Sequence, residues 1–200
     1  MSLKVLLRDT NIRIVNAWKK VFSDYSNIEI SCGHIFDLNA DAIISPANSF
    51  GLMDGGIDLA YSEYFGWDLE KELQEIICRE YFGEIPVGLA AIVKTKNNKI
   101  KYLISAPTMR IPENVSNTLN AYLAFRASLI EIIKFNQNRK QKISSVLCPG
   151  LGTLTGNISP EKCAIQMKYA YDSIILNKDS FLSGWRDIEL MEKKLINERG

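Results

Sequence analysis

The sequence predicts an α/β fold in which helices cover both faces of a central sheet. Short apolar strands and amphipathic helices alternate along the chain, from a strand at 3–8 to a helix at 185–197. The length of 200 residues suits one domain, and 46% hydrophobic residues supply enough material for its core. We find no internal repeat, low-complexity tract or linker that would divide the chain. We therefore expect a single three-layer α/β/α domain over residues 1–200.

The first half of the chain begins with strands and one helix. Residues 3–8 (LKVLLR) form a short apolar run that predicts a buried strand. Apolar residues at near-helical spacing follow, with Thr10 as the expected N-cap of a helix that runs to about Phe22. The alternating IEISC at 28–32 and the apolar DAIIS at 41–45 predict two further strands.

A loop with three glycines follows the third strand and leads into two helices, predicted at 57–65 and 68–81. The rest of the chain contains two strands joined by a turn, a helix of about five turns, a last strand and two helices. We expect these elements at 89–94, 100–105, 115–135, 144–148, 160–176 and 185–197. The charged segment 178–200, which contains Trp185, is expected to be a C-terminal covering helix with a solvated face.

Charge and hydropathy exclude several classes of protein. The net charge of +1 comes from 24 Lys and Arg against 23 Asp and Glu, so we expect no direct binding of duplex nucleic acid. The apolar run at the N-terminus is too short and too soon charged for a signal peptide. No stretch approaches ~18 uninterrupted apolar residues, which argues against membrane partners. We therefore expect a cytoplasmic protein.

The sequence offers little for metal binding. The chain contains one histidine, His34, and its four cysteines lie far apart without a C-x-x-C pair. A Cys/His zinc site is therefore not expected, and we predict no metal and reduced, mostly buried thiols. The cysteines are Cys32, Cys78, Cys148 and Cys163.

Two loops carry the chemistry. In the first, Gly55 and Gly56 open a helix directly after a strand-to-helix loop, which exposes backbone N–H groups at the positive end of a helix dipole. Such a loop is either an anion site or a tight turn without a ligand. The second loop, PGLGTLTG at 149–156, also follows an apolar strand and precedes a helix. Two such loops predict a diphosphate site.

Neither loop matches the motifs of the common nucleotide cofactors. The sequence contains neither G-x-x-x-x-G-K-[ST] nor G-x-G-x-x-G. We therefore expect neither ATP hydrolysis nor a nicotinamide cofactor, and predict that the protein uses no cofactor.

The first loop resembles a known signature. DAIISPANS at 41–49, followed after a short spacer by GGID at 55–58, is similar to the macrodomain signature D-A-I-V-N-A-A-N…G-G-G-G-V-D. GHI at 33–35 stands where that family has G-D-I, and the second loop with SPEKCA at 159–164 resembles its second phosphate-binding loop. The resemblance spans roughly residues 28–177 and implies a macrodomain with a central mixed sheet.

The resemblance implies that the ligand is ADP-ribose or an ADP-ribosylated macromolecule. Asn48 would contact the distal ribose, and Ile35 would lie beside the adenine. Backbone N–H groups of the first loop would bind one side of the diphosphate, and the second loop would cover the other side. These residues are Gly55, Gly56 and Ile57 in the first loop and Gly150, Gly152, Thr153, Leu154, Thr155 and Gly156 in the second.

Asp58 matches the aspartate that, in hydrolysing members of the family, positions or activates a water near the anomeric carbon. Asp58 and Asn48 are therefore the candidate catalytic residues. The alternative is that Asp58 only stabilises the first turn of its helix through the dipole.

The sequence departs from the family pattern at three places. His34 replaces the aspartate that accepts from the adenine amino group, so it is predicted to form an edge of the base pocket or to be purely structural. Ser45 replaces the first asparagine of the signature, which weakens the comparison with hydrolases. Met53 and Asp54 replace two glycines, and we expect the Asp54 carboxylate to lie outward in solvent.

Three functions stay open at this stage. The first is hydrolysis of ADP-ribose-1''-phosphate, of an ADP-ribosyl ester on protein, or of an ADP-ribosylated nucleic acid end. The second is a sensor that binds ADP-ribose without turning it over. The third is a changed pocket that recognises another nucleotide or serves as a scaffold, because function depends on the site rather than on the fold.

Overall fold

A computed structural model describes residues 3–178 and 184–197 of the chain. Its centre is a six-stranded sheet with the order β2-β1-β6-β3-β5-β4. Neighbouring strands are parallel except β4 and β5, which are antiparallel, so the predicted central mixed sheet is confirmed. The strands are β1 (Lys4–Asp9), β2 (Ile28–Cys32), β3 (Ala40–Ser45), β4 (Ala91–Lys94), β5 (Ile100–Ser105) and β6 (Ser145–Cys148).

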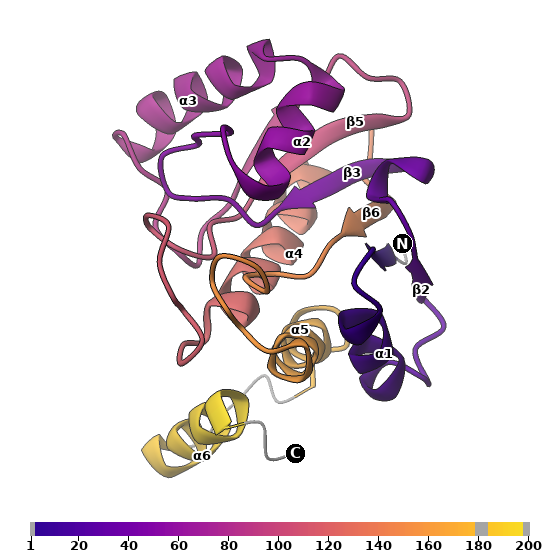
Figure 1. Cartoon of the computed structure of the whole chain (residues 1–200), viewed down its shortest axis with the longest axis vertical. Helices are drawn as coiled ribbons and strands as arrows, with labels where there is room; N and C mark the ends of the chain where they lie inside the picture. The colour runs from indigo at the N-terminus through magenta and orange to yellow at the C-terminus, as the bar shows by residue number, and fades with distance from the viewer. Residues whose placement is uncertain (1–2, 179–183, 198–200) are drawn as a thin grey trace.

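Helices cover the two faces of this sheet, as Figure 1 shows, which confirms the three-layer α/β/α prediction. Helices α2 and α3 lie on one face, and α1, α4 and α5 lie on the other. The helices are α1 (Ile12–Val21), α2 (Gly56–Phe65), α3 (Asp68–Tyr81), α4 (Asn120–Asn138), α5 (Pro160–Ile174) and α6 (Trp185–Asn197), with a 3-10 turn η1 (Ile35–Asp37).

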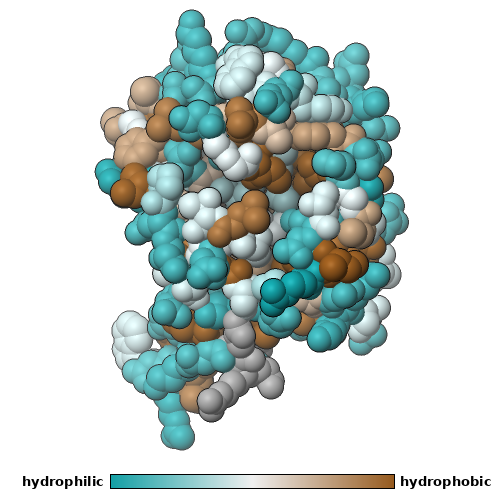
Figure 2. Space-filling view, viewed as in Figure 1, coloured by the Kyte–Doolittle hydropathy of each residue, from teal (hydrophilic) through white to brown (hydrophobic). Residues whose placement is uncertain are grey.

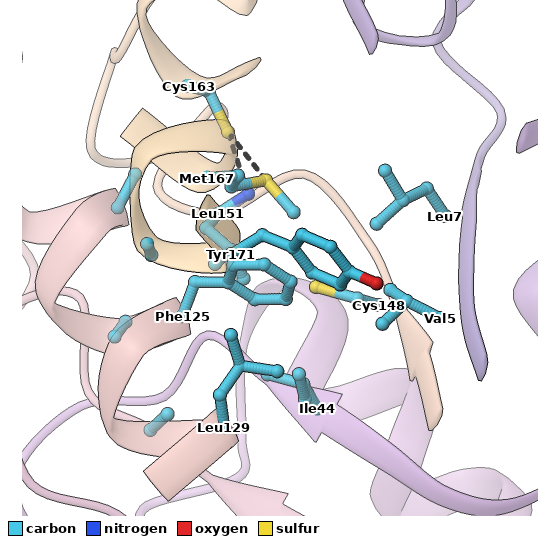
Figure 3. Close-up of a cluster of buried hydrophobic side chains, with 14 of the residues drawn as sticks. Val5, Leu7, Ile44, Phe125, Leu129, Cys148, Leu151, Cys163, Met167 and Tyr171 are labelled. Carbon is cyan, nitrogen blue, oxygen red and sulfur yellow. Dashed lines mark hydrogen bonds between the residues drawn. The ribbon is translucent and has the colours of Figure 1, made fainter. Parts of the chain in front are cut away.

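The period-2 pattern of the strands divides the core between the two faces. In β1, Val5 and Leu7 pack among the side chains of α1, α4 and α5, whereas Leu6 belongs to the cluster under α2 and α3. In β3, Ile44 and Ile43 are divided in the same way. Figure 3 shows the first cluster, in which side chains from the strands meet those of α4 and α5.

The topology also positions the functional loops. Strands β1, β6 and β3 are adjacent and parallel, so their carboxyl ends lie at one edge of the sheet. The two glycine-bearing loops leave the sheet there, after β3 and after β6. Ligands of parallel sheets bind at such an edge.

Three helix starts differ from the predictions, and that of α2 does so by one residue. Helix α1 is capped by Asn11 rather than Thr10, because the Asn11 side chain accepts a hydrogen bond from the N–H of Arg13. Helix α4 begins at Asn120 rather than 115, since the N–H of Val115 donates to the carbonyl of Gly156 and so connects that segment to the second loop. Helix α4 also continues to Asn138, beyond the predicted end.

The prediction that the thiols are mostly buried was only half right. Cys148 and Cys163 are buried, whereas Cys32 and Cys78 are exposed. Cys32 ends an edge strand and Cys78 lies on the outer side of α3, where neither can reach the core.

The C-terminal helix α6 lies against α5 at the end of the molecule away from the sheet (Figure 1). Of its side chains Leu195 is buried, and Trp185 is exposed. The lower end of Figure 2, where this helix lies, is mostly hydrophilic. Residues 179–183 and 198–200, which belong to the predicted covering segment, lie outside the described residues. Within the described part of the chain, no helix combines the length and the apolar character needed to cross a membrane.

Candidate functional site

A cleft of about 270 Å³ opens at the carboxyl edge of β1, β6 and β3. The loop at 46–56, here called loop 1, forms one wall together with the start of α2. The loop at 149–159, loop 2, forms the facing wall. Of the residues predicted for the site, Asn48, Gly55, Gly56, Ile57, Asp58, Gly150, Gly152, Thr153, Leu154, Thr155 and Gly156 line the cleft.

His34 and Ile35 do not line this cleft. His34 is exposed, and its carbonyl accepts a hydrogen bond of 2.7 Å from Nε of Arg8. Ile35 is buried in the hydrophobic cluster under α2 and α3. Both residues follow β2, and their contact with the base stays a prediction.

The N-terminus of α2 borders open space. Gly55 is extended, and Gly56 has a φ of +57°, in the left-handed region that favours glycine. A Cβ at either position would meet no heavy atom within 4 Å, and within the described residues no side chain caps this helix. The first N–H groups of α2 thus lack a side-chain acceptor at the positive end of the helix dipole.

Loop 2 is closed by its own backbone. The N–H of Ile158 donates to the carbonyl of Gly152 at 3.0 Å. A Cβ on Gly156 would lie 2.6 Å from that same carbonyl oxygen, so only glycine fits there. This closure leaves Leu154 and Thr155 exposed at the tip of the loop, on the cleft.

The Asn48 side chain holds loop 1 together. Its Oδ1 accepts from the N–H groups of Phe50 and Leu52, and its Nδ2 donates to the carbonyl of Leu52 at 2.7 Å. Both lone pairs of the amide oxygen are therefore used within the loop, and one amide N–H is left for a ligand.

Asp58, in the first turn of α2, is a buried carboxylate at the base of the cleft. The hydroxyl of Ser45 donates a hydrogen bond to its Oδ1. Burial raises the pKa of Asp58 to about 6, with smaller contributions from the charges of Asp54 and Glu70, while the Ser45 hydrogen bond acts in the opposite direction.

Asp54 belongs both to the molecular surface and to the lining of the cleft. It is exposed to solvent, as predicted, and it also lines the mouth of the cleft. Its neighbour Met53 is buried, and the Met53 N–H donates to Glu70 while its carbonyl accepts from the Ser62 hydroxyl. Met53 therefore anchors loop 1 to α2 and α3.

Sequence reasoning missed the cleft residues that follow β1. Asp9, Thr10 and Asn11 line the cleft on the side of loop 2. The Asp9 carboxylate accepts from the N–H of Asn11 at 2.8 Å and from the N–H of Gly150 at 3.0 Å. The available signal was a strand that ends in an acidic residue, but the sequence does not say that this strand pairs with β6.

Comparison with known proteins identifies the family. The family model described as Macro domain matches residues 44–167, which is more than half of the chain and contains both loops. The chain belongs to the Macro domain family. Asp9, Thr10 and Asn11 of this macrodomain precede the matched segment, as do His34 and Ile35.

Two relatives illustrate the range of similarity. An uncharacterized protein of Aquifex aeolicus is 34% identical over 141 residues, which cover 70% of this chain and 78% of the relative. A macro domain-containing protein of Listeria monocytogenes is 40% identical over 79 residues, which cover 40% of this chain and 44% of the relative.

Solved macrodomains share the fold at low sequence identity. The macrodomain of Mycobacterium tuberculosis DarG superposes with a TM-score of 0.59 at 20% identity, covering 72% of this macrodomain and 88% of that chain. An Oceanobacillus iheyensis macrodomain with ADP gives a TM-score of 0.57 at 22% identity, covering 78% and 83%. These similarities support the fold assignment of this macrodomain.

Proposed function

We propose that this macrodomain binds ADP-ribose, or a derivative of it, in the cleft between loop 1 and loop 2. The observation that carries the proposal is that an uncapped helix N-terminus and a glycine-bearing loop face each other across one cleft. Structures of a similar macrodomain from Oceanobacillus iheyensis were solved with ADPR and with ADP.

The diphosphate would lie between the two loops. The N–H groups of Gly55, Gly56 and Ile57 would bind one side of it, because a helix N-terminus favours a bound anion. The exposed tip of loop 2, with Thr153 and Thr155, would cover the other side with N–H and hydroxyl donors. The distal ribose would then lie beside Asn48, whose remaining amide N–H can donate to a ribose hydroxyl.

We further propose that the protein hydrolyses an ADP-ribosyl conjugate or ADP-ribose-1''-phosphate. Asp58 would take a proton from a water molecule as that water attacks the anomeric carbon of the distal ribose. The bond from this carbon to the leaving oxygen breaks, and the leaving group departs as a carboxylate or a phosphate. A pKa of about 6 leaves Asp58 mostly ionised near neutral pH. A general base must be in this ionised form to accept a proton.

A sensor that binds without turnover is the second candidate, and a specific observation favours it. Asp58 is 7% exposed and already accepts from Ser45, which limits its access to a water. In addition, Ser45 stands where the family signature has its first asparagine. If Asp58 has only a structural role, the loops still bind the diphosphate.

Titration of the purified protein with ADP-ribose by calorimetry tests binding. We expect micromolar affinity, about −8 kcal/mol, and much weaker binding of AMP and of ribose-5-phosphate, since neither spans the cleft. Absence of binding at millimolar ADP-ribose would contradict the proposal and favour a changed pocket.

The Asp58→Asn variant then separates the enzyme from the sensor. We expect it to stop release of ADP-ribose from an ADP-ribosylated protein or from ADP-ribose-1''-phosphate while affinity stays within several-fold. The matched control is Asp37→Asn, an exposed acid outside the cleft, which should leave turnover unchanged. Equal turnover in wild type and Asp58→Asn would reject Asp58 as the base.

A further inference from the structure

A second groove, of about 960 Å³, lies at the edge of the sheet opposite the cleft. Its walls are the loop at 23–27, the second half of α5 and the helix α6, which lies beside α5 in Figure 1. The loop at 23–27 precedes β2, which is parallel to β1, and α5 begins beside loop 2 and runs away from it. The groove and the cleft therefore share no lining residue.

The charged side chains that line this groove are mostly basic, and we call it the basic groove. They are Lys20, Lys168, Lys178 and Lys194 with Asp24 and Asp172, which leaves an excess of two positive charges. The lysines come from α1, α5, the segment after α5 and α6, so the tertiary structure gathers them. An anion in the groove would meet several cations at once, whereas a cation would be repelled.

Asp172 neutralises part of this charge. Its side chain is 12% exposed and accepts from the hydroxyl of Tyr25 and from Nζ of Lys168, both at 2.6 Å. Nζ of Lys178 lies 3.6 Å from the same carboxylate. Lys20 and Lys194 are exposed and form no ion pair among the residues that the structure describes. These two ammonium groups can therefore pair with an anion from outside the chain.

The uncharged lining of the basic groove is largely aliphatic. The apolar residues are Val21, Ile165, Leu176, Leu190, Met191 and Leu195. Two of them, Leu176 and Leu190, are 41% and 57% exposed and lie on opposite walls, after α5 and in α6. Apolar side chains beside lysines suit a ligand that has both an apolar part and an anionic part.

The aromatic rings of the groove already have partners. The ammonium groups of Lys168 and Lys178 each lie 5.5 Å from the centre of the Tyr25 ring. The Tyr169 ring lies 5.7 Å from that of Tyr122. The lining thus favours an alkyl chain over a stacked nucleobase.

We propose that the basic groove binds a single-chain amphiphile with an anionic headgroup, such as a fatty acid carboxylate or an alkyl phosphate. The headgroup would lie among the lysines, with Lys20 and Lys194 as its main cations, and the alkyl chain would contact Leu176 and Leu190. The volume falls within the range of about 300–1,000 Å³ that is typical of small-molecule sites. Because the groove and the cleft share no residue, this site does not depend on binding of ADP-ribose.

Calorimetry with dodecyl phosphate, below its micellar concentration, tests the site. We expect saturable binding of one molecule per chain. Octyl phosphate should bind at least tenfold more weakly, because each fully buried methylene contributes about fourfold. Dodecyltrimethylammonium, which has the same chain and the opposite charge, should bind about a hundredfold more weakly, as should inorganic phosphate. Equal binding of the anionic and the cationic amphiphile would overturn the proposal.

A double variant, Lys20→Glu with Lys194→Glu, assigns the binding to the groove. We expect it to weaken binding of dodecyl phosphate about a hundredfold and to leave the affinity for ADP-ribose unchanged. The matched control is Lys94→Glu with Lys99→Glu, which makes the same change in net charge at exposed lysines of the β4–β5 hairpin. This control should bind dodecyl phosphate like the wild type.

The same lysines could instead serve stability alone, since both lie in the last turn of a helix and offset its dipole. In that case the double variant would lower the melting temperature and keep the affinity for dodecyl phosphate, which would contradict the proposal. The variant Leu190→Asn tests the apolar wall separately at an exposed position. It should reduce the preference for dodecyl over octyl phosphate, and an unchanged preference would place the chain elsewhere.

Sedimentation with vesicles that contain phosphatidylglycerol distinguishes a free amphiphile from a membrane surface. Binding to vesicles without binding of monomeric dodecyl phosphate would overturn the proposal in favour of a membrane contact. Failure to bind dodecyl phosphate while ADP-ribose still binds would reject the basic groove as a ligand site and leave the proposed function intact. Binding that is lost in the double lysine variant and kept in its control supports the proposal.

Discussion

The hydroxyl of Ser45, at the end of β3, donates a hydrogen bond to Oδ1 of Asp58 in the first turn of α2. This contact joins the sheet to the helix that follows loop 1, beneath the cleft. It also opposes the effect of burial on the pKa of Asp58, since a donor to the carboxylate stabilises the charged form. The properties of Asp58 therefore depend on a residue thirteen positions earlier in the chain.

Removal of this hydroxyl should move the titration of Asp58. In Ser45→Ala the carboxylate loses its donor while burial is unchanged, so its pKa should rise above about 6. A carbon-13 NMR titration of the carboxyl groups measures this directly. If the protein is a hydrolase, the acid limb of its pH–rate profile should shift to higher pH by the same amount. An unchanged pKa in Ser45→Ala would show that the hydrogen bond is not important in solution.

Asp58 should also make stability depend on pH. Its folded-state pKa lies above its value in the unfolded chain, so the ionised form disfavours folding. Relative to Asp58→Asn, the wild type should lose stability as pH rises from about 4 through 6, by about 3 kcal/mol in total. Urea unfolding of both proteins across this range isolates the effect, because other groups titrate alike in both. A difference that does not vary with pH would contradict it.

A buried serine on the neighbouring strand provides a contrast with Ser45. Ser105 pairs in register with Ser45, and its hydroxyl is buried without a hydrogen-bond partner among the described residues. Ser105→Ala should therefore keep stability or raise it by about 1 kcal/mol. Ser45→Ala should lower stability by about 2 kcal/mol, because it leaves the Asp58 carboxylate without its donor. Equal effects in thermal unfolding would mean that Ser105 has a partner in solution.

The open space around Gly55, in loop 1, allows a matched pair of substitutions at this residue. The residue is extended, and a Cβ there meets no atom within 4 Å. Gly55→Ala should therefore change stability by no more than about 1 kcal/mol and preserve binding of ADP-ribose. Gly55→Glu brings a negative charge to the expected diphosphate position and should weaken binding about a hundredfold or more. Equal affinity of the two variants in calorimetry would argue that the diphosphate lies elsewhere.

Asp41 joins β3 and β6 near their starts, at the ends opposite the cleft. Its Oδ2 accepts from the backbone N–H and the hydroxyl of both Ser144 and Ser145, at 2.6 to 3.1 Å. Burial acts to raise its pKa, but these hydrogen bonds outweigh that effect and lower it. Asp41→Ala should lower the free energy of unfolding by about 2 kcal/mol, measured in urea at neutral pH.

The sign of its pH dependence is opposite to that of Asp58. Because the folded-state pKa of Asp41 is lowered, its contribution should be present above about pH 4 and lost as the solution is acidified further. Asp24→Ala, at an exposed acid, is the control and should change stability little. A loss of stability in Asp41→Ala no larger than in this control would contradict the assigned role.

Local patterns predicted most of the fold. The strands at 28–32 and 100–105 and the helices at 68–81 and 185–197 have the predicted bounds, because periodic apolar residues and turn residues are local signals. The start of α4 was wrong because a contact with Gly156, distant in sequence, fixes the residues before it. The cap of α1 was also wrong, although the hydrogen bond that decides it, from the N–H of Arg13 to the Asn11 side chain, is local.

The sequence by itself determined the α/β class, the two glycine-bearing loops and the resemblance to the macrodomain signature, since each depends on residues close together in the chain. Only the tertiary structure decided which residues share the cleft. It brought Asp9 to loop 2 through the pairing of β1 with β6, and it left His34 and Ile35 outside the cleft. It also joined Ser45 to Asp58 and buried that carboxylate. Strand order and burial arise from long-range packing, and no local pattern specifies which distant side chains that packing brings together.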